Sequence, residues 1–117
     1  MAGNIQPTLD KIMEIDGAIA CAVVDATSGI LLGQAGSGID MNVAAAGNSE
    51  VVRAKLKTMK SLGLQDNIKD IMITLGKAYH LIKIHGNLFI YVALNKGKSN
   101  LALARHKIAE AESTLTV

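Results

Sequence analysis

Gly97, Lys98 and Ser99 lie after an apolar stretch and before a helical pattern, which is the setting of a phosphate-binding P-loop. That loop needs another glycine five residues before the Gly-Lys pair. Val92 occupies that position, inside the apolar stretch, so the backbone there is not free to wrap a phosphate chain. We therefore interpret the segment as a connection that ends in a helix cap at Ser99 or Asn100.

Gly33, Gly36 and Gly38 lie between an apolar stretch and a helical pattern, as the glycines of a dinucleotide-binding loop do. Their spacing differs from that loop, and the flanking strands are not placed for a parallel crossover. We interpret these glycines as a hinge between a strand and a helix.

His80, His85 and His106 have no Cys, Asp or Glu partner at the spacing of a metal site. His80 and His85 are five residues apart in an expected strand, so they point to opposite faces. Cys21, the single cysteine, lies in a strongly apolar stretch and is interpreted as a small core residue. No Ser-His-Asp set or carboxylate pair stands out at loop positions. The sequence predicts no catalytic, cofactor-binding or metal-binding residue, and a protein that is not an enzyme.

The length of 117 residues predicts one domain over residues 1–117. The chain has one Phe, two Tyr and no Trp, so it offers few stacking platforms for single strands, and a net charge of +2 is too small to indicate nucleic acid. Residues 1–50 carry one Lys against six acids and the remainder is basic, which predicts either two surfaces of opposite sign or mixed charge after folding. No leader-like or membrane-spanning stretch is visible. We expect a cytoplasmic protein that neither binds nucleic acid nor inserts into a membrane.

Hydrophobic periodicity predicts the element order α-β-β-α-β-β-β-α. The expected helices are 7–15, 41–62 and 101–112, and the expected strands are 18–24, 30–34, 68–75, 79–85 and 88–94. Strands 18–24 and 88–94 are apolar on both faces, so we expect them side by side in the middle of a sheet that helices cover on both sides. The neighbouring strands are joined by short turns and are therefore expected to be antiparallel.

The long helix 41–62 carries two apolar stripes about 60–80° apart on a helical wheel. The first stripe consists of Met41, Ala45, Val52, Leu56 and Met59. The second consists of Ala44, Val51 and Leu62, with Asn48 and Lys55 between the two. One interpretation is a single broad core face from which Lys55 reaches out to water. The other is that the first stripe packs on the sheet while the second meets the same helix of another copy, with Asn48 setting the register.

Arg53, Lys57 and Lys60 recur at helical spacing on the opposite side of this helix. We call these three residues the basic stripe. It is either a solvated face of the helix or a contact for an acidic surface of a partner.

Five short pieces occur in a fixed order along the chain. They are Ile15-Asp16-Gly17 before an apolar strand, Asp25 and Gly29 in a hairpin turn, Leu62-Gly63-Leu64 after a long Ala-rich helix, Ile71-Met72-Ile73 in a strand, and Asn100-Leu101-Ala102-Leu103-Ala104-Arg105 at the start of a helix. This combination, which covers about residues 5–112, resembles the Roadblock family of dynein light chains and bacterial regulators of Ras-like GTPases.

The resemblance implies an α+β domain of profilin-like architecture, with a five-stranded antiparallel sheet, the long helix on one face and the two terminal helices on the other. It also implies a dimer formed through the long helix and the third strand. We call the residues that would form it the self-association surface: Ala44, Asn48, Val51, Lys55, Leu62, Ile71 and Ile73.

Roadblock proteins bind small GTPases as scaffolds or activators, or assemble into larger complexes, and none is known as an enzyme. The resemblance therefore implies a homodimeric, non-enzymatic regulator or scaffold of a Ras-like small GTPase. A small-ligand sensor and a structural subunit of a larger complex are the alternatives. Nothing marks an arginine finger, and Arg105 is interpreted as a structural residue.

Overall fold

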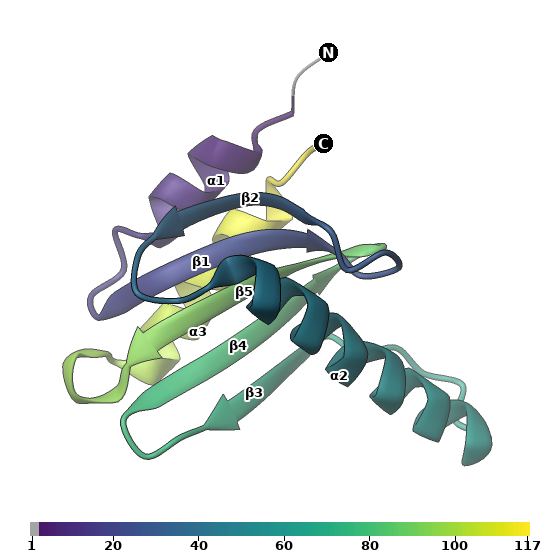
Figure 1. Cartoon of the computed structure of the whole chain (residues 1–117). Coiled ribbons are helices and arrows are strands. Elements are labelled where there is room, and N and C mark those ends of the chain that lie inside the picture. The colour runs from purple at the N-terminus through teal and green to yellow at the C-terminus, as the bar shows by residue number, and fades with distance from the viewer. Residues whose placement is uncertain (1–2) are drawn as a thin grey trace.

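A sheet of five antiparallel strands separates two layers of helices in the computed structural model, which describes residues 3–117 (Figure 1). The helices are α1 (Ile5–Ile12), α2 (Met41–Ser61) and α3 (Leu101–Ser113), and a 3-10 turn, η1 (Lys96–Lys98), precedes α3. The strands are β1 (Ala18–Asp25), β2 (Leu31–Gly36), β3 (Asp70–Thr74), β4 (Ala78–His85) and β5 (Leu88–Asn95). The predicted order of elements is confirmed.

The strands lie in the order β2-β1-β5-β4-β3, so β1 and β5 occupy the middle of the sheet. Their central residues are buried on both faces, and Val23 of β1 lies opposite Ile90 of β5. The prediction that the two doubly apolar strands are central neighbours is therefore confirmed. The strands β2 and β3 form the two edges of the sheet.

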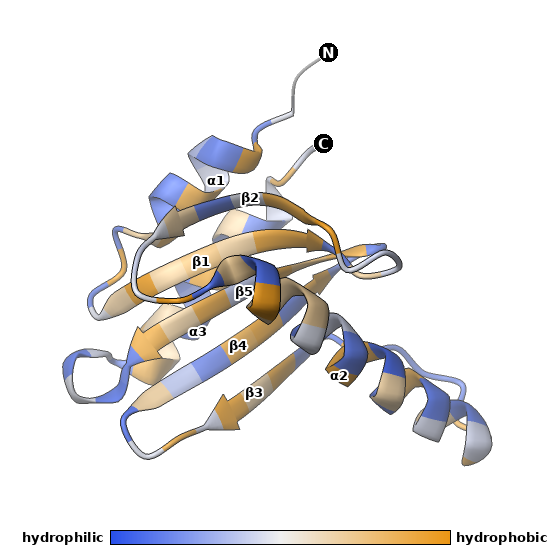
Figure 2. Cartoon of the chain, in the orientation of Figure 1, coloured by the Kyte–Doolittle hydropathy of each residue, from blue (hydrophilic) through white to orange (hydrophobic). Residues whose placement is uncertain are grey.

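Each face of the sheet has its own hydrophobic core. Cys21 and Val23 of β1 point toward α1 and α3, whereas Ala20, Ala22 and Val24 point toward α2. Figure 1 shows α1 and α3 together behind the sheet and α2 alone in front of it. In Figure 2 the strands between these layers are the most continuously apolar part of the molecule, as expected for a sheet covered on both sides.

Several element ends differ from the predicted ones for reasons of local hydrogen bonding. The helix α1 begins two residues earlier, with Pro7 in its first turn, where the missing N–H is tolerated. The strand β2 begins after Ile30, because Ile30 N–H donates to the Ser28 hydroxyl and belongs to the turn. The strand β3 ends before Leu75, whose N–H donates to Ala78 O and starts the next turn.

Side-chain caps fix where the two longer helices begin. The Asp40 carboxylate accepts the backbone N–H groups of Asn42 and Val43 at 3.1 and 3.2 Å, at the start of α2. At the start of α3, the Asn100 side chain accepts Leu103 N–H at 3.1 Å. Of the two predicted caps for α3, the structure uses Asn100.

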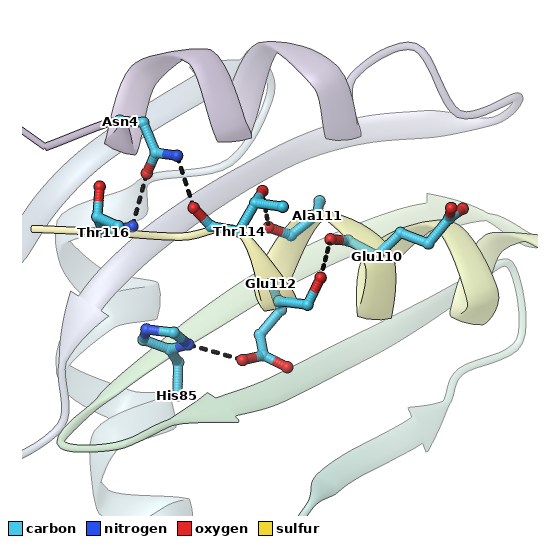
Figure 3. A network of polar contacts seen from close by, with 8 residues as sticks. Asn4, His85, Glu110, Ala111, Glu112, Thr114 and Thr116 are labelled. Atoms are coloured by element: carbon cyan, nitrogen blue, oxygen red, sulfur yellow. Dashed lines mark hydrogen bonds and ion pairs between the residues drawn. The ribbon is translucent and has the colours of Figure 1, made fainter.

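The two ends of the described chain are joined by one asparagine (Figure 3). The Asn4 side chain donates to Thr114 O at 2.7 Å and accepts Thr116 N–H at 2.6 Å. These bonds hold the residues after α3 against the start of α1. Within residues 3–117, no helix has the length and apolar character needed to cross a bilayer.

Candidate functional site

Helix α2 packs on β1 and β2 and then runs past the ends of the strands (Figure 1). Val52 is 3% exposed, but Leu56, one turn later, is 47% exposed. The prediction that Leu56 packs on the sheet with the first stripe is therefore wrong. Met59, three residues after Leu56, is again only 8% exposed, so this face of α2 stays covered and Leu56 lies at its edge. Ser49, which the wheel did not single out, is fully buried and donates its hydroxyl to Ala45 O at 2.7 Å.

The second apolar stripe of α2 is only partly covered. Ala44 is half-buried, whereas Val51 and Leu62 are exposed. Of the two polar residues between the stripes, Asn48 is half-buried and Lys55 is exposed. The stripe is therefore neither part of the closed core nor a solvated polar face, and within the described residues its outer part has nothing packed over it.

The strand β3 presents apolar side chains on the same side of the sheet as α2. Ile71 lies opposite Ile82, which belongs to the core under α2, so Ile71 and Ile73 share that side. Ile71 is half-buried and Ile73 is exposed. Two residues of the self-association surface, Ile71 and Ile73, therefore lie on the same side of the sheet as α2, on an edge strand that pairs with a neighbour on one side only.

A histidine and a tyrosine, which no pattern in the sequence brings together, lie beside this surface. The Tyr91 hydroxyl is 3.1 Å from His80 Nδ1, and the two rings pack edge to face with centroids 5.3 Å apart. His80 pairs across the strands with Ile73. Burial lowers the pKa of His80 and raises the pKa of Tyr91, so both groups are neutral at neutral pH.

Within the basic stripe, Arg53 makes a structural hydrogen bond, whereas Lys57 and Lys60 are exposed to solvent. The Arg53 guanidinium donates to Ala26 O at 3.0 Å, and Ala26 N–H donates to Asn87 O at 2.9 Å. Arg53 therefore fastens α2 to the β1–β2 turn, which is itself fastened to the β4–β5 turn. Lys57 and Lys60 are exposed on the same flank of the helix.

A groove of about 360 Å³ lies beside Arg53, between α2 and these two turns. We call it the α2 groove. Its apolar lining consists of Val52, Leu56, Ile68, Ile84 and Leu88, and Arg53, Thr27 and Asn67 are among its polar residues. Residues from four separate parts of the chain form it, so no local pattern in the sequence indicates it.

Two further polar contacts join α3 to the strands of the sheet. The Arg105 guanidinium donates to Asp70 at 2.7 Å and joins α3 to β3, as its interpretation as a structural residue predicts. His85 Nδ1 lies 2.6 Å from the Glu112 carboxylate on the α3 side (Figure 3), so His80 and His85 do point to opposite faces. Among residues 3–117, no three His, Cys, Asp or Glu side chains lie close enough to hold a metal ion.

No protein-family model and no curated protein matches this sequence. Among solved structures, Myxococcus xanthus MglB superposes with a TM-score of 0.85 at 22% identity, covering 95% of this chain and 90% of that one. A Roadblock/LC7 domain from Streptomyces avermitilis superposes with a TM-score of 0.80 at 10% identity, covering 91% of this chain and 89% of that domain.

This chain has a Roadblock fold. A structure described as MglB with tetrameric arrangement also has this Roadblock fold, with a TM-score of 0.78, 12% identity, and coverage of 91% of this chain and 80% of that one. The Roadblock arrangement of one long helix in front of the sheet and two terminal helices behind it matches the fold that the sequence resemblance implies. At these identities the likeness establishes the fold, and function rests on the surfaces described above.

Proposed function

We propose that this protein is a homodimeric, non-enzymatic regulator or scaffold that binds a Ras-like small GTPase. The observation that carries the proposal is the partly exposed, largely apolar self-association surface on a Roadblock fold. The sequence resemblance implies a dimer through this surface and a GTPase as partner, and solved structures with the same fold include MglB proteins.

The dimer explains why the second stripe and the β3 edge are apolar and uncovered. Two copies of β3 pairing across a two-fold axis would join the sheets and pair the backbone groups of the edge. The second stripe of α2, with Val51 and Leu62, would then meet its counterpart. Asn48, which is half-buried between the two stripes, would fix the register of the two helices.

The basic stripe supplies a contact for the partner. Lys57 and Lys60 are exposed on the flank of α2 that points away from the second stripe, so they stay accessible in the dimer. Arg53 is anchored to Ala26, which holds this end of the stripe in place. A regulator that acts through such a surface changes the behaviour of the GTPase by binding, without catalytic residues of its own.

The test is capture followed by an activity measurement. The tagged protein is used to capture proteins from an extract of its source organism, and GTP hydrolysis by the recovered GTPase is measured with and without the protein. We expect a Ras-like GTPase to be recovered, and a Lys57→Glu/Lys60→Glu variant to recover less of it than Lys107→Glu, a charge reversal on α3. Recovery of no GTPase, together with unchanged hydrolysis when one is supplied, would contradict the proposal.

A further inference from the structure

The walls of the α2 groove are held in place before anything binds. Arg53 Nη1 donates to Ala26 O at 3.0 Å and Ala26 N–H donates to Asn87 O at 2.9 Å, so α2 and two turns form one connected rim. The Asp25 carboxylate accepts Thr27 N–H at 2.9 Å and keeps the first of these turns in shape. A ligand that enters the groove therefore meets a preformed site, which lowers the cost of binding.

The floor of the groove is apolar and one of its walls is an uncovered leucine. Val52 is closed off at 3% exposure, whereas Leu56 is 47% exposed and faces the same hollow. A volume of about 360 Å³ admits a large apolar side chain. An apolar side chain bound in the groove would be buried there and would also bury Leu56, and burial of both apolar surfaces favours binding.

The flank of α2 along the groove is positive. Arg53, Lys57 and Lys60 follow one another along it, against Glu50, which is the one acidic residue of α2 and lies on the same flank. Carboxylates that lie next to the inserted apolar side chain would face these cations. The charge therefore selects an acidic segment over a basic one.

The groove remains open when two copies associate as proposed. On the helical wheel, Leu56 and Val51 are about 140° apart, so the groove and the self-association surface lie on different flanks of α2. Dimer formation would leave two α2 grooves per assembly, each able to bind independently of the other.

We propose that the α2 groove binds a linear segment of a partner protein in which an aliphatic or aromatic anchor side chain is followed closely by carboxylates. The anchor fills the space between Leu56, Ile84 and Leu88, and the carboxylates lie along Lys57 and Lys60. This inference rests on the proposed function for the existence of a protein partner, and it adds the chemistry by which that partner is recognised.

The test uses random linear peptides displayed on phage and selected against the purified full-length protein. We expect the enriched peptides to share an aliphatic or aromatic residue followed by Asp or Glu. Titration of the tightest synthetic peptide into ¹⁵N-labelled protein should shift the amide signals of Ala26, Leu56 and Asn87. Leu56→Ser should weaken binding about tenfold, and Lys60→Glu should weaken it severalfold, with an effect that shrinks as salt is added.

Helix α3 supplies matched controls. Leu103 is 48% exposed and Lys107 follows it by four residues, just as Lys60 follows Leu56. Leu103→Ser and Lys107→Glu should leave peptide binding unchanged. The inference is overturned if no peptides are enriched, if they lack carboxylates, if the shifted signals lie elsewhere, or if the α3 variants weaken binding equally. No GTPase takes part in the peptide selection. The selection can therefore fail while the capture of a GTPase succeeds, and the capture can fail while the selection succeeds, so the two proposals are tested separately.

Discussion

Cys21 is held in a chemical environment that removes its reactivity. Its side chain is fully buried and its thiol donates to Leu9 O at 3.5 Å. Burial, and to a lesser degree the negative charge of Asp10, raises the pKa of the thiol to about 12. Because the thiolate is the reactive form, almost none of this cysteine is nucleophilic in the folded protein at neutral pH.

We therefore expect Cys21 to resist iodoacetamide at mildly alkaline pH until the protein unfolds. The modified fraction, followed by mass spectrometry, should stay near zero in native buffer and rise to completion once urea has unfolded the chain. The rise should coincide with the loss of far-UV circular dichroism. Alkylation in native buffer at the rate of a small-molecule thiol would contradict the buried position of Cys21.

Asp25 makes the β1–β2 turn sensitive to acid. Hydrogen bonds from the hydroxyl and then the N–H of Thr27, with a smaller contribution from Ser28, hold the pKa of Asp25 below its ordinary value of 3.8. The stabilisation is therefore fully present above pH 3.8 and is lost as the pH falls through the lower pKa of the folded state.

The expected result is that the urea midpoint of the natural protein falls more steeply in acid than that of Asp25→Asn. Asparagine keeps the accepting oxygen but does not titrate, so the variant isolates the contribution of the carboxylate. The two proteins should differ most above pH 3.8 and converge at lower pH. Parallel profiles over the whole range would show that the turn does not depend on the charge.

At the scale of the element, Asp40 determines how stably α2 begins. Asp40→Ala removes the acceptor for the N–H groups of Asn42 and Val43, and should lower the free energy of unfolding by about 1 kcal/mol. Asp40→Asn should cost much less, because asparagine caps a helix nearly as well. Urea denaturation followed by circular dichroism measures both. An equal loss in the two variants would point to the charge of Asp40 and not to its capping bonds.

The elements themselves were largely predictable because each is encoded by its own residues. The apolar runs of β1 and β5 indicate central strands whatever lies around them, and Asp40 and Gly63 mark the two ends of α2. Leu56 shows where this reasoning ends. A helical wheel gives the face on which a residue lies, but not how wide the covered part of that face is. Val52 and Met59 are covered, whereas Leu56, at the edge of the same stripe, is not.

The candidate site was predictable only in part, for the same physical reason. The basic stripe and the second apolar stripe repeat along one helix and are visible in the sequence. Two contacts of the site are not visible in this way. Arg53 meets Ala26 because a turn packs against α2, and His80 meets Tyr91 because β4 and β5 are neighbours in the sheet. Nothing local to either residue encodes these contacts.

At the scale of the whole molecule, the two edges of the sheet provide a direct test of the proposed dimer. Ile73 on β3 is 39% exposed and Leu32 on β2 is 42% exposed, so a lysine at either position changes a similarly exposed edge residue. In the proposed dimer, a two-fold axis relates the two β3 strands and brings the two copies of residue 73 to the same interface. Ile73→Lys would therefore lose apolar contact and add like charges across it.

Sedimentation equilibrium at micromolar concentration should show a dimer for the natural protein and for Leu32→Lys, and a monomer for Ile73→Lys. The substitution is on the surface, so the circular dichroism spectrum of the monomeric variant should match that of the natural protein, which separates dissociation from unfolding. A dimer that survives Ile73→Lys but dissociates with Leu32→Lys would move the interface to the β2 edge. It would also leave the apolar residues of β3 without the cover that the proposed function gives them.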